Sequence, residues 1–207
     1  MIHEIINNIS QSAPYITWQE WLSTVCQIMS VYYARKNNIL VYPTGIVGVL
    51  LASWIYFFVA EPALYAEGTL NLYYLGMSMW GWYNWVQKKT ATDLVFPISW
   101  CNTRKRIKGA SLGVIAWVII YLVLINFTDS NTPASDACVS GSAVIAMWWM
   151  AQRKIEHWIA WMFSNLIAIP LNFYKELYLF GFMYIVFLVM AYLGYRDWKA
   201  EVTPQRS

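Results

Sequence analysis

The chain has 207 residues, of which 59% are hydrophobic and 18% aromatic, while only 12% are charged. Soluble domains carry about 25% charged residues, so this is the composition of a membrane protein and leaves no room for a separate soluble domain. The net charge of +3 is small, and the basic residues stand at the ends of apolar segments, which argues against nucleic-acid binding.

Seven apolar segments predict membrane-spanning helices, each of which needs about 20 residues. Residues 1–14 precede them as a short lead of mixed polarity, and residues 90–108 form a long polar stretch after the third segment. The approximate bounds of the seven spans are 16–33, 39–60, 69–86, 110–127, 137–150, 155–173 and 177–194. We therefore predict an all-α integral membrane protein with seven transmembrane helices.

The basic residues predict the orientation of the chain. With seven spans, the segments after spans one, three and five lie on the same side as the C-terminus, and together these segments hold 13 of the 14 Lys and Arg residues. Only Lys175 lies on the other side, where we expect it at the interface with Glu176 as its local partner. Because cytoplasmic segments are rich in Lys and Arg, we expect a cytoplasmic C-terminus and an outer N-terminus in the inner membrane.

The two outer parts of the chain share a pattern that predicts an internal repeat. Span one ends like span five, and span three ends like span seven: Ala34-Arg35-Lys36 with Ala151-Gln152-Arg153-Lys154, and Gly81-Trp82-Tyr83-Asn84-Trp85 with Gly194-Tyr195-Arg196-Asp197-Trp198. The repeats at about 16–87 and 136–199 run in parallel, joined by a loop and helix at about 90–127. Such a 3+1+3 arrangement is typical of transporters that bind substrate near mid-membrane, where the halves meet.

The sixth span holds Trp158, Trp161 and Asn165 at the helical spacing i, i+3, i+7. At about 100° per residue, these side chains fall within roughly 60° on one helix face. Indoles stack on flat aromatic or cationic rings, and an amide both donates and accepts hydrogen bonds. An amide at mid-membrane depth is costly unless it faces a partner or a water-filled cavity. The set predicts the core of a binding site; the alternative is an interfacial Trp pair and an Asn that joins two helices.

Polar residues near the middle of other spans extend this candidate substrate-binding site. They are Gln27, Asn71, Tyr74, Ser78 and Ser142. Each also has a structural interpretation: Tyr74 and its neighbour Tyr73 suit an interfacial aromatic belt, the serines permit close helix packing, and Gln27 can bond across helices. Three tryptophans near the cytoplasmic ends are interpreted as belt anchors: Trp82, Trp85 and Trp198.

The sequence offers no residue set for catalysis or for a metal or cofactor. Its two histidines, His3 and His157, have no second ligand at helical spacing, and its three cysteines form no CxxC pair. No phosphate-binding glycine motif and no charged residue at mid-membrane depth is present. We therefore predict that the protein is not an enzyme and that it moves its substrate by facilitated diffusion rather than by ion coupling.

Four motifs resemble those of the PnuC family of bacterial vitamin transporters, over essentially the whole chain. They are Trp158-x-x-Trp161-x-x-x-Asn165, Tyr42-Pro43-Thr44-Gly45-Ile46, Leu64-Tyr65-Ala66 leading to Gly81-Trp82-Tyr83-Asn84-Trp85, and Asp136-Ala137. The resemblance implies a helix bundle like that of the SWEET sugar transporters. It also implies facilitated uptake of nicotinamide riboside, which a separate cytoplasmic kinase phosphorylates and thereby traps.

The resemblance leaves the vitamin open. Family members often carry Gln where this chain has Asn71, and the family also contains thiamine and riboflavin carriers. Thiamine is likewise a flat cationic heteroaromatic, so tryptophan stacking does not separate it from nicotinamide riboside. A more distant alternative, a scaffold or receptor that transports nothing, predicts tight packing around Asn165 without a central cavity. The expected partners are the vitamin, the lipid bilayer and, functionally, the kinase, while assembly into a homo-oligomer stays open.

Overall fold

The computed structural model describes residues 18–59, 65–88, 94, 96–128 and 130–202, and these form one bundle of seven α-helices. The helices are α2 (Trp18–Arg35), α3 (Val41–Trp54), α4 (Tyr65–Val86), α5 (Thr103–Phe127), α6 (Pro133–Met150), α7 (Glu156–Tyr174) and α8 (Tyr178–Val202). A short π-helix, η2 (Ile55–Val59), continues α3. The predicted all-α fold with seven helices is confirmed, and the predicted lead at 1–14 lies outside the described residues.

The largest departures from the predicted bounds are at the start of α5 and at the end of α8. α5 begins at Thr103 rather than near residue 110, because Asn102 caps it: its Oδ1 accepts a hydrogen bond from the Lys105 backbone N–H at 2.9 Å. The basic cluster expected in a loop is therefore the first turn and a half of a helix. α8 continues past Gly194 to Val202, and its added turns place Trp198 against the end of α2.

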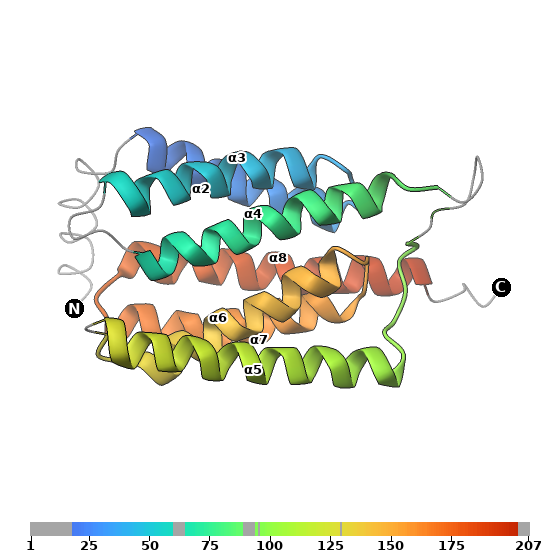
Figure 1. Ribbon diagram of the computed structural model, residues 1–207. Helices are drawn as coiled ribbons and strands as arrows, with labels where there is room; N and C mark the ends of the chain where they lie inside the picture. The colour runs from blue at the N-terminus through green and yellow to red at the C-terminus, as the bar shows by residue number, and fades with distance from the viewer. Residues whose placement is uncertain (1–17, 60–64, 89–93, 95, 129, 203–207) are drawn as a thin grey trace.

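Contacts between the helices close six of them into a ring. α2 packs on α3, α3 on α4, α4 on α6, α6 on α7 and α7 on α8, and α8 returns to α2. α5 packs on α6 from outside this ring and forms the edge of the bundle in Figure 1. Side chains that face the inside of the ring are therefore the ones shielded from lipid.

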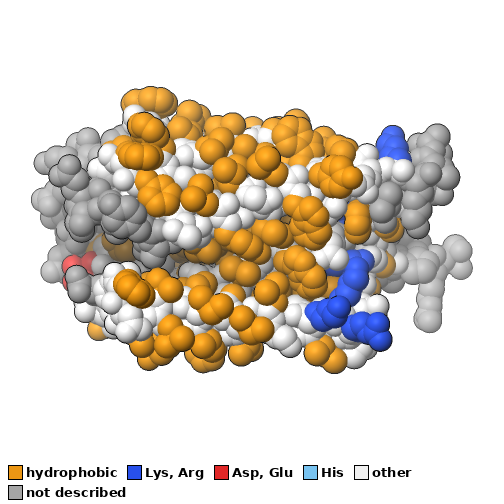
Figure 2. Space-filling view, in the orientation of Figure 1, with side chains coloured by type: hydrophobic (Ala, Val, Ile, Leu, Met, Phe, Trp, Pro, Cys, Tyr) orange, Lys and Arg blue, Asp and Glu red, His pale blue; other side chains and the backbone are white. Residues whose placement is uncertain are grey.

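The outer surface of the bundle suits a bilayer. Hydrophobic side chains cover the middle of the face shown in Figure 2, and basic side chains gather at one end. Within the described residues, three helical stretches are long and apolar enough to cross a membrane: Val41–Val59, Thr103–Phe127 and Phe180–Val202. On α5, Val114 and Ile119 are 57% and 56% exposed, as lipid-facing residues of an outer helix would be.

Charge divides the two ends of the bundle. All described Lys and Arg residues except Lys175 lie where α2, α4, α6 and α8 end and where α5 begins. We call this the basic end. Its position agrees with the predicted charge pattern, in which successive loops alternate between a basic and a non-basic side.

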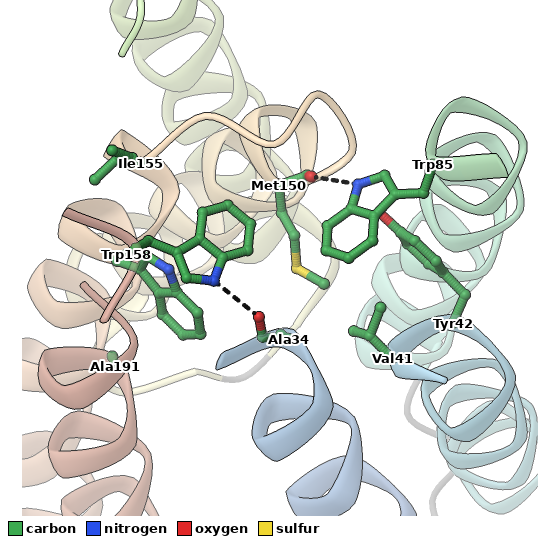
Figure 3. Packing of buried hydrophobic residues seen from close by; sticks show 9 residues of the cluster. Ala34, Val41, Tyr42, Trp85, Met150, Ile155, Trp158 and Ala191 are labelled. Atoms are coloured by element: carbon green, nitrogen blue, oxygen red, sulfur yellow. Dashed lines mark hydrogen bonds between the residues drawn. The ribbon is translucent and has the colours of Figure 1, made fainter. Parts of the chain in front are cut away.

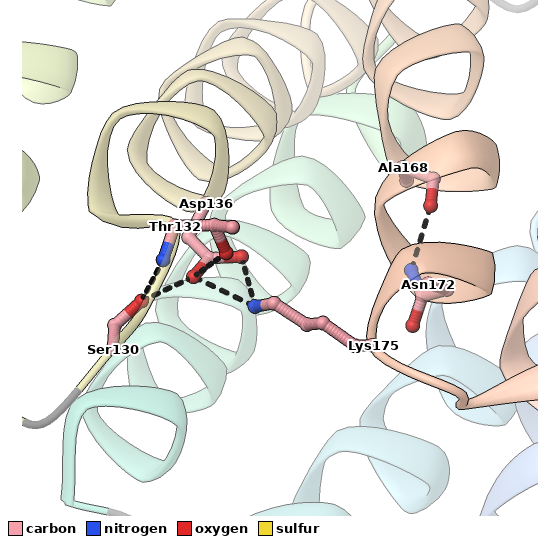
Figure 4. A network of polar contacts seen from close by, with 6 residues as sticks. All are labelled: Ser130, Thr132, Asp136, Ala168, Asn172 and Lys175. Atoms are coloured by element: carbon pink, nitrogen blue, oxygen red, sulfur yellow. Dashed lines mark hydrogen bonds and ion pairs between the residues drawn. The ribbon is translucent and has the colours of Figure 1, made fainter.

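At the opposite end, Lys175 joins α7 to the start of α6. Its Nζ donates to both carboxylate oxygens of Asp136, at 2.6 and 2.8 Å (Figure 4). The hydroxyls of Ser130 and Thr132 donate to the same carboxylate, at 2.7 and 3.2 Å. The prediction that Glu176 is the partner of Lys175 is wrong, because Glu176 has a left-handed backbone (φ 61°) just after α7 while Asp136 faces the ammonium group.

Candidate functional site

The middle of α7 carries a buried amide with an unused hydrogen-bonding capacity. Asn165 is 3% exposed, and no described residue forms a hydrogen bond with its carboxamide. Its oxygen and nitrogen are not among the fully buried side-chain atoms that lack a partner, so these two atoms keep some accessible surface although the residue as a whole is buried. The carboxamide can therefore still donate and accept hydrogen bonds, and its predicted role in substrate binding stays a prediction.

Hydroxyl groups beside this position hold α7 in register. Ser164 is buried, and its Oγ donates to the Val139 carbonyl of α6 at 3.0 Å. In the other part of the ring, the Ser23 Oγ of α2 donates to the Gly48 carbonyl of α3 at 2.9 Å. The Ser164 bond restricts sliding of α7 along α6 beside Asn165, and the Ser23 bond does the same for α2 and α3.

The two predicted tryptophans occupy different surroundings. Trp158 is buried at the basic end, with its ring centroid 5.8 Å from that of Trp198 in an edge-to-face arrangement. Trp161 is partly buried and packs against the same core. Asn165 follows Trp158 by seven residues, or about 10 Å along the helix. The motif therefore runs from a packed core at the basic end to the unpaired amide deeper in the bundle.

α4 presents a second polar stripe. Asn71, Tyr74 and Ser78 repeat the i, i+3, i+7 spacing of the α7 motif and so share one helix face, on which Ser78 is buried. The adjacent Tyr73 hydroxyl donates to the Val144 carbonyl at 2.9 Å, which joins α4 to α6. Tyr73 thus has a structural role at a helix contact rather than the belt role considered from the sequence.

The other two predicted residues already use their donor groups within their own helices. The Gln27 Nε2 donates to the Ser23 Oγ at 3.1 Å, and the Ser142 Oγ donates to the Cys138 carbonyl at 2.7 Å. Their acceptor positions are not used by these bonds. The assignment of all eight predicted residues to a substrate site stays a prediction.

Two tryptophans that the sequence assigned to an interfacial belt lie in the interior. Trp85 is 2% exposed and Trp198 is fully buried, and each donates its indole N–H to a backbone carbonyl at the end of another helix. The belt interpretation is wrong for both, whereas the 40% exposed Trp82 agrees with it. Their equivalent places in the two predicted repeats were the signal that could have identified them.

A buried arginine fastens the loops of the basic end. Arg153 donates from Nε to the Asn37 Oδ1 at 3.1 Å and from one terminal nitrogen to the Phe96 carbonyl at 3.0 Å. Its guanidinium carbon lies 4.2 Å from the centroid of the Trp85 ring. Burial lowers the pKa of Arg153, but a guanidinium keeps its charge in proteins. The end of α6 is thereby tied to the ends of α2 and α4.

Comparisons with known proteins agree with this architecture. The sequence profile of the nicotinamide mononucleotide transporter family matches residues 17–200. The riboflavin/roseoflavin transporter RibM of Streptomyces davaonensis is 22% identical over 89% of this chain and 85% of its own length. The nicotinamide riboside transporter PnuC of Escherichia coli is 21% identical over 88% of this chain and 85% of its own.

A solved structure shows the same fold. The crystal structure of the vitamin B3 transporter PnuC superposes with a TM-score of 0.69, at 22% identity, over 95% of this chain and 87% of that chain. The similarity thus includes all seven helices rather than one motif. The chain therefore belongs to the nicotinamide mononucleotide transporter family, which confirms its resemblance to the PnuC transporters.

Proposed function

We propose that this protein takes up nicotinamide riboside by facilitated diffusion. The observation that carries the proposal is the carboxamide of the buried Asn165, which forms no hydrogen bond with a described residue and shares a helix face with Trp158 and Trp161. Indole faces suit a flat cationic pyridinium ring, and a carboxamide suits the amide or the ribose hydroxyls of this substrate. Relatives named as nicotinamide riboside transporters support the same substrate.

The charge distribution favours a nucleoside over a nucleotide. The described Lys and Arg residues lie toward the helix ends, so a phosphate group at the level of Asn165 would lack a cationic partner. Moving an unpaired anion through an apolar bundle is costly. Phosphorylation by a separate cytoplasmic kinase would then trap the substrate after passage, with the basic end facing the cytoplasm across the inner membrane.

A different flat vitamin is the second candidate. One relative is named as a riboflavin/roseoflavin transporter and is as similar to this chain as the nicotinamide riboside transporters are. Asn71, where family members often carry Gln, leaves thiamine as another choice. The burial of Asn165 also fits the scaffold or receptor reading, but membership of a transporter family favours transport.

Uptake by proteoliposomes tests the proposal. Labelled nicotinamide riboside should enter vesicles containing the purified protein until its concentrations equalise, without an ion gradient. Unlabelled nicotinamide riboside should compete better than thiamine, riboflavin or the mononucleotide. Better competition by another vitamin would transfer the proposal to that vitamin, and no uptake of any of them would contradict transport.

Asn165→Leu tests the site within the same assay. Losing the carboxamide should lower uptake about tenfold or more, because the substrate's polar groups would then be buried without partners. The matched control is Asn126→Leu, since the Asn126 amide donates to the Leu122 carbonyl on the exposed helix α5, outside the ring. Equal uptake by Asn165→Leu and the control would contradict the assigned site.

A further inference from the structure

The basic end of the ring is closed by one packed cluster, which we call the seal. Every ring helix contributes to it, and the end of the loop before α7 adds one residue. Its members are Ala34, Val41, Tyr42, Trp85, Met150, Ile155, Trp158, Ala191 and Trp198 (Figure 3). A substrate that leaves the ring interior at this end must pass through the seal.

Two equivalent hydrogen bonds hold the seal across the halves of the ring. The Trp85 Nε1 of α4 donates to the Met150 carbonyl at the end of α6, at 3.1 Å. The Trp198 Nε1 of α8 donates to the Ala34 carbonyl at the end of α2, also at 3.1 Å. The dashed lines in Figure 3 mark the two bonds where they reach Met150 and Ala34. Each joins the third helix of one predicted repeat to the first helix of the other.

A second pair of polar contacts lies beside these bonds in the same arrangement. The Asn84 amide, one residue before Trp85, donates to the Ala151 carbonyl at 3.1 Å. Asp197, one residue before Trp198, accepts a bond from the Arg35 Nε at 2.6 Å. In each half, an Asn or Asp followed by a Trp therefore forms polar contacts with the end of the first helix of the other half.

Glycines allow the same closure in both halves. A Cβ added at Gly81 would lie 2.5 Å from the Tyr42 ring, and one added at Gly194 would lie 2.5 Å from the Trp158 ring. Each glycine precedes its tryptophan by four residues, so it lies one turn deeper in the bundle. A side chain at either position would separate the third helix from the second helix of its own repeat.

The seal also contains polar atoms that are not satisfied. The Tyr42 hydroxyl and the Trp158 Nε1 are buried without a hydrogen-bond partner among the described residues, as is the Nε2 of the adjoining His157. Buried groups of this kind disfavour the packed arrangement. The closed seal is thus stabilised by the hydrogen bonds of Trp85 and Trp198 and destabilised by its unpaired polar atoms.

We propose that Trp85 and Trp198 are the gate residues of transport at the basic end. Their two bonds lie between α4 and α6 and between α8 and α2, which are the contacts that join the two halves, so opening at this end requires both bonds to break. Opening then exposes Tyr42 and Trp158, whose polar atoms gain partners from water or from the passing substrate. This inference rests on the proposed transport function, but its test needs no substrate.

The test measures the reactivity of a cysteine placed in the seal. Ala191 is 1% exposed, so Ala191→Cys, with the three native cysteines changed to serine, reports opening through its reaction with a hydrophilic maleimide. Trp85→Phe and Trp198→Phe keep a ring but remove the N–H donor. Each should raise the reaction rate about three- to tenfold, and the double variant should raise it further.

Trp117→Phe is the matched control. Its Nε1 also donates to a helix carbonyl, that of Ala134 at 3.2 Å, but it joins α5 to the start of α6 and lies far from the basic end. Its reaction rate should equal that of the parent. If the tryptophan variants do not fold, Gly81→Ala and Gly194→Ala should give the same rise in rate by keeping the seal from closing.

If the tryptophan and glycine variants that fold react with the maleimide at the rate of the parent, the proposed gate is overturned, whatever the uptake assay shows. Raised rates in both halves would support it even if no vitamin were transported, and in that case only the proposed function would fail. A rise for Trp117→Phe equal to that of the gate variants would also overturn it, because the effect would then belong to any lost indole bond.

Discussion

At the residue scale, Tyr42 and Tyr73 differ in whether the hydroxyl is hydrogen-bonded, so removing the hydroxyl should change thermal stability in opposite directions. The Tyr42 hydroxyl is buried without a described partner, while the Tyr73 hydroxyl donates to the Val144 carbonyl. Tyr42→Phe should therefore raise the midpoint of thermal unfolding in detergent, since it removes an unpaired polar group whose burial destabilises the fold by about 1 kcal/mol. Tyr73→Phe should lower it by a similar amount. A fall in both midpoints would show that the Tyr42 hydroxyl is paired.

Cys101 gives a prediction about reactivity at the basic end. Burial and then the neighbouring Glu156 carboxylate raise the pKa of the Cys101 thiol to about 12. Because thiolates are the reactive form, Cys101 should react with iodoacetamide at pH 8 about 100-fold or more slowly in the folded protein than in the unfolded chain. A variant with Cys26 and Cys138 changed to serine isolates this thiol.

The same shift has a consequence for stability. The pKa of the Cys101 thiol is higher in the folded state, so the thiol of the unfolded chain loses its proton at a lower pH. The stabilisation linked to Cys101 is thus present below the ordinary thiol pKa and is lost progressively as the pH approaches about 12. Rapid alkylation of the folded protein at pH 8 would contradict both the buried position and the raised pKa.

The role of a residue was predictable from the sequence only where it depends on spacing within one helix and not on contacts with another helix. The shared face of Trp158, Trp161 and Asn165 follows from helical spacing alone, and the burial of Asn165 agrees with the predicted inward face. The roles of Trp85 and Trp198 do not follow in this way. A tryptophan at a helix end suits both a belt and a seal, and the choice depends on the helix end opposite it.

At the scale of helices, the Asp136–Lys175 ion pair connects α6 to the end of α7. Both side chains are partly exposed, so screening limits the contribution of the pair to about 1 kcal/mol. Asp136→Asn should lower the free energy of unfolding by about this amount, and added salt should narrow the difference from the parent. Glu176→Gln is the control and should have no effect, because Asp136 is the residue paired with Lys175.

A double-mutant cycle separates the pair from the other bonds of Asp136. The carboxylate also accepts hydrogen bonds from Ser130 and Thr132, which Lys175→Met leaves intact. The coupling between Asp136→Asn and Lys175→Met should therefore be smaller than the total effect of Asp136→Asn. Zero coupling would show that the two charges do not stabilise the fold together.

The existence of the helices was predictable from the sequence, but several of their ends were not, above all the start of α5 and the end of α8. Hydropathy located all seven segments because spanning helices need long apolar runs. It placed the start of α5 too late, since Asn102 extends the helix through a charged turn that no apolar pattern marks. It ended α8 too early, because the last turns of α8 are held by contacts of Trp198 with α2 rather than by hydropathy.

At the scale of the whole molecule, the order of the ring depends on contacts that the sequence does not specify locally. Sequence spacing predicted two similar sets of three helices, and the structure joins them through α2 with α8 and α4 with α6. These two connections are equivalent under the proposed repeat, because each unites a first helix with a third. The exact repeat boundaries and the likeness to SWEET transporters stay predictions.

The charge division between the two ends predicts how the molecule lies in the membrane. Except for Lys175, the described basic residues lie at the basic end, and such residues are retained in the cytoplasm. A green fluorescent protein fused after the last residue should therefore fluoresce in cells, and alkaline phosphatase fused there should be inactive. The control is a phosphatase fusion within the loop between α7 and α8, beside Lys175, which should be active.

This orientation determines the direction of the proposed trapping. Substrate released through the seal would enter the cytoplasm. Phosphorylation there adds a negative charge, which prevents the substrate from passing back through the apolar interior of the ring. An active phosphatase at the C-terminus would place the seal on the outer side. The gate formed by Trp85 and Trp198 would then control entry rather than release, and one-way uptake would need a different explanation from cytoplasmic phosphorylation after the seal.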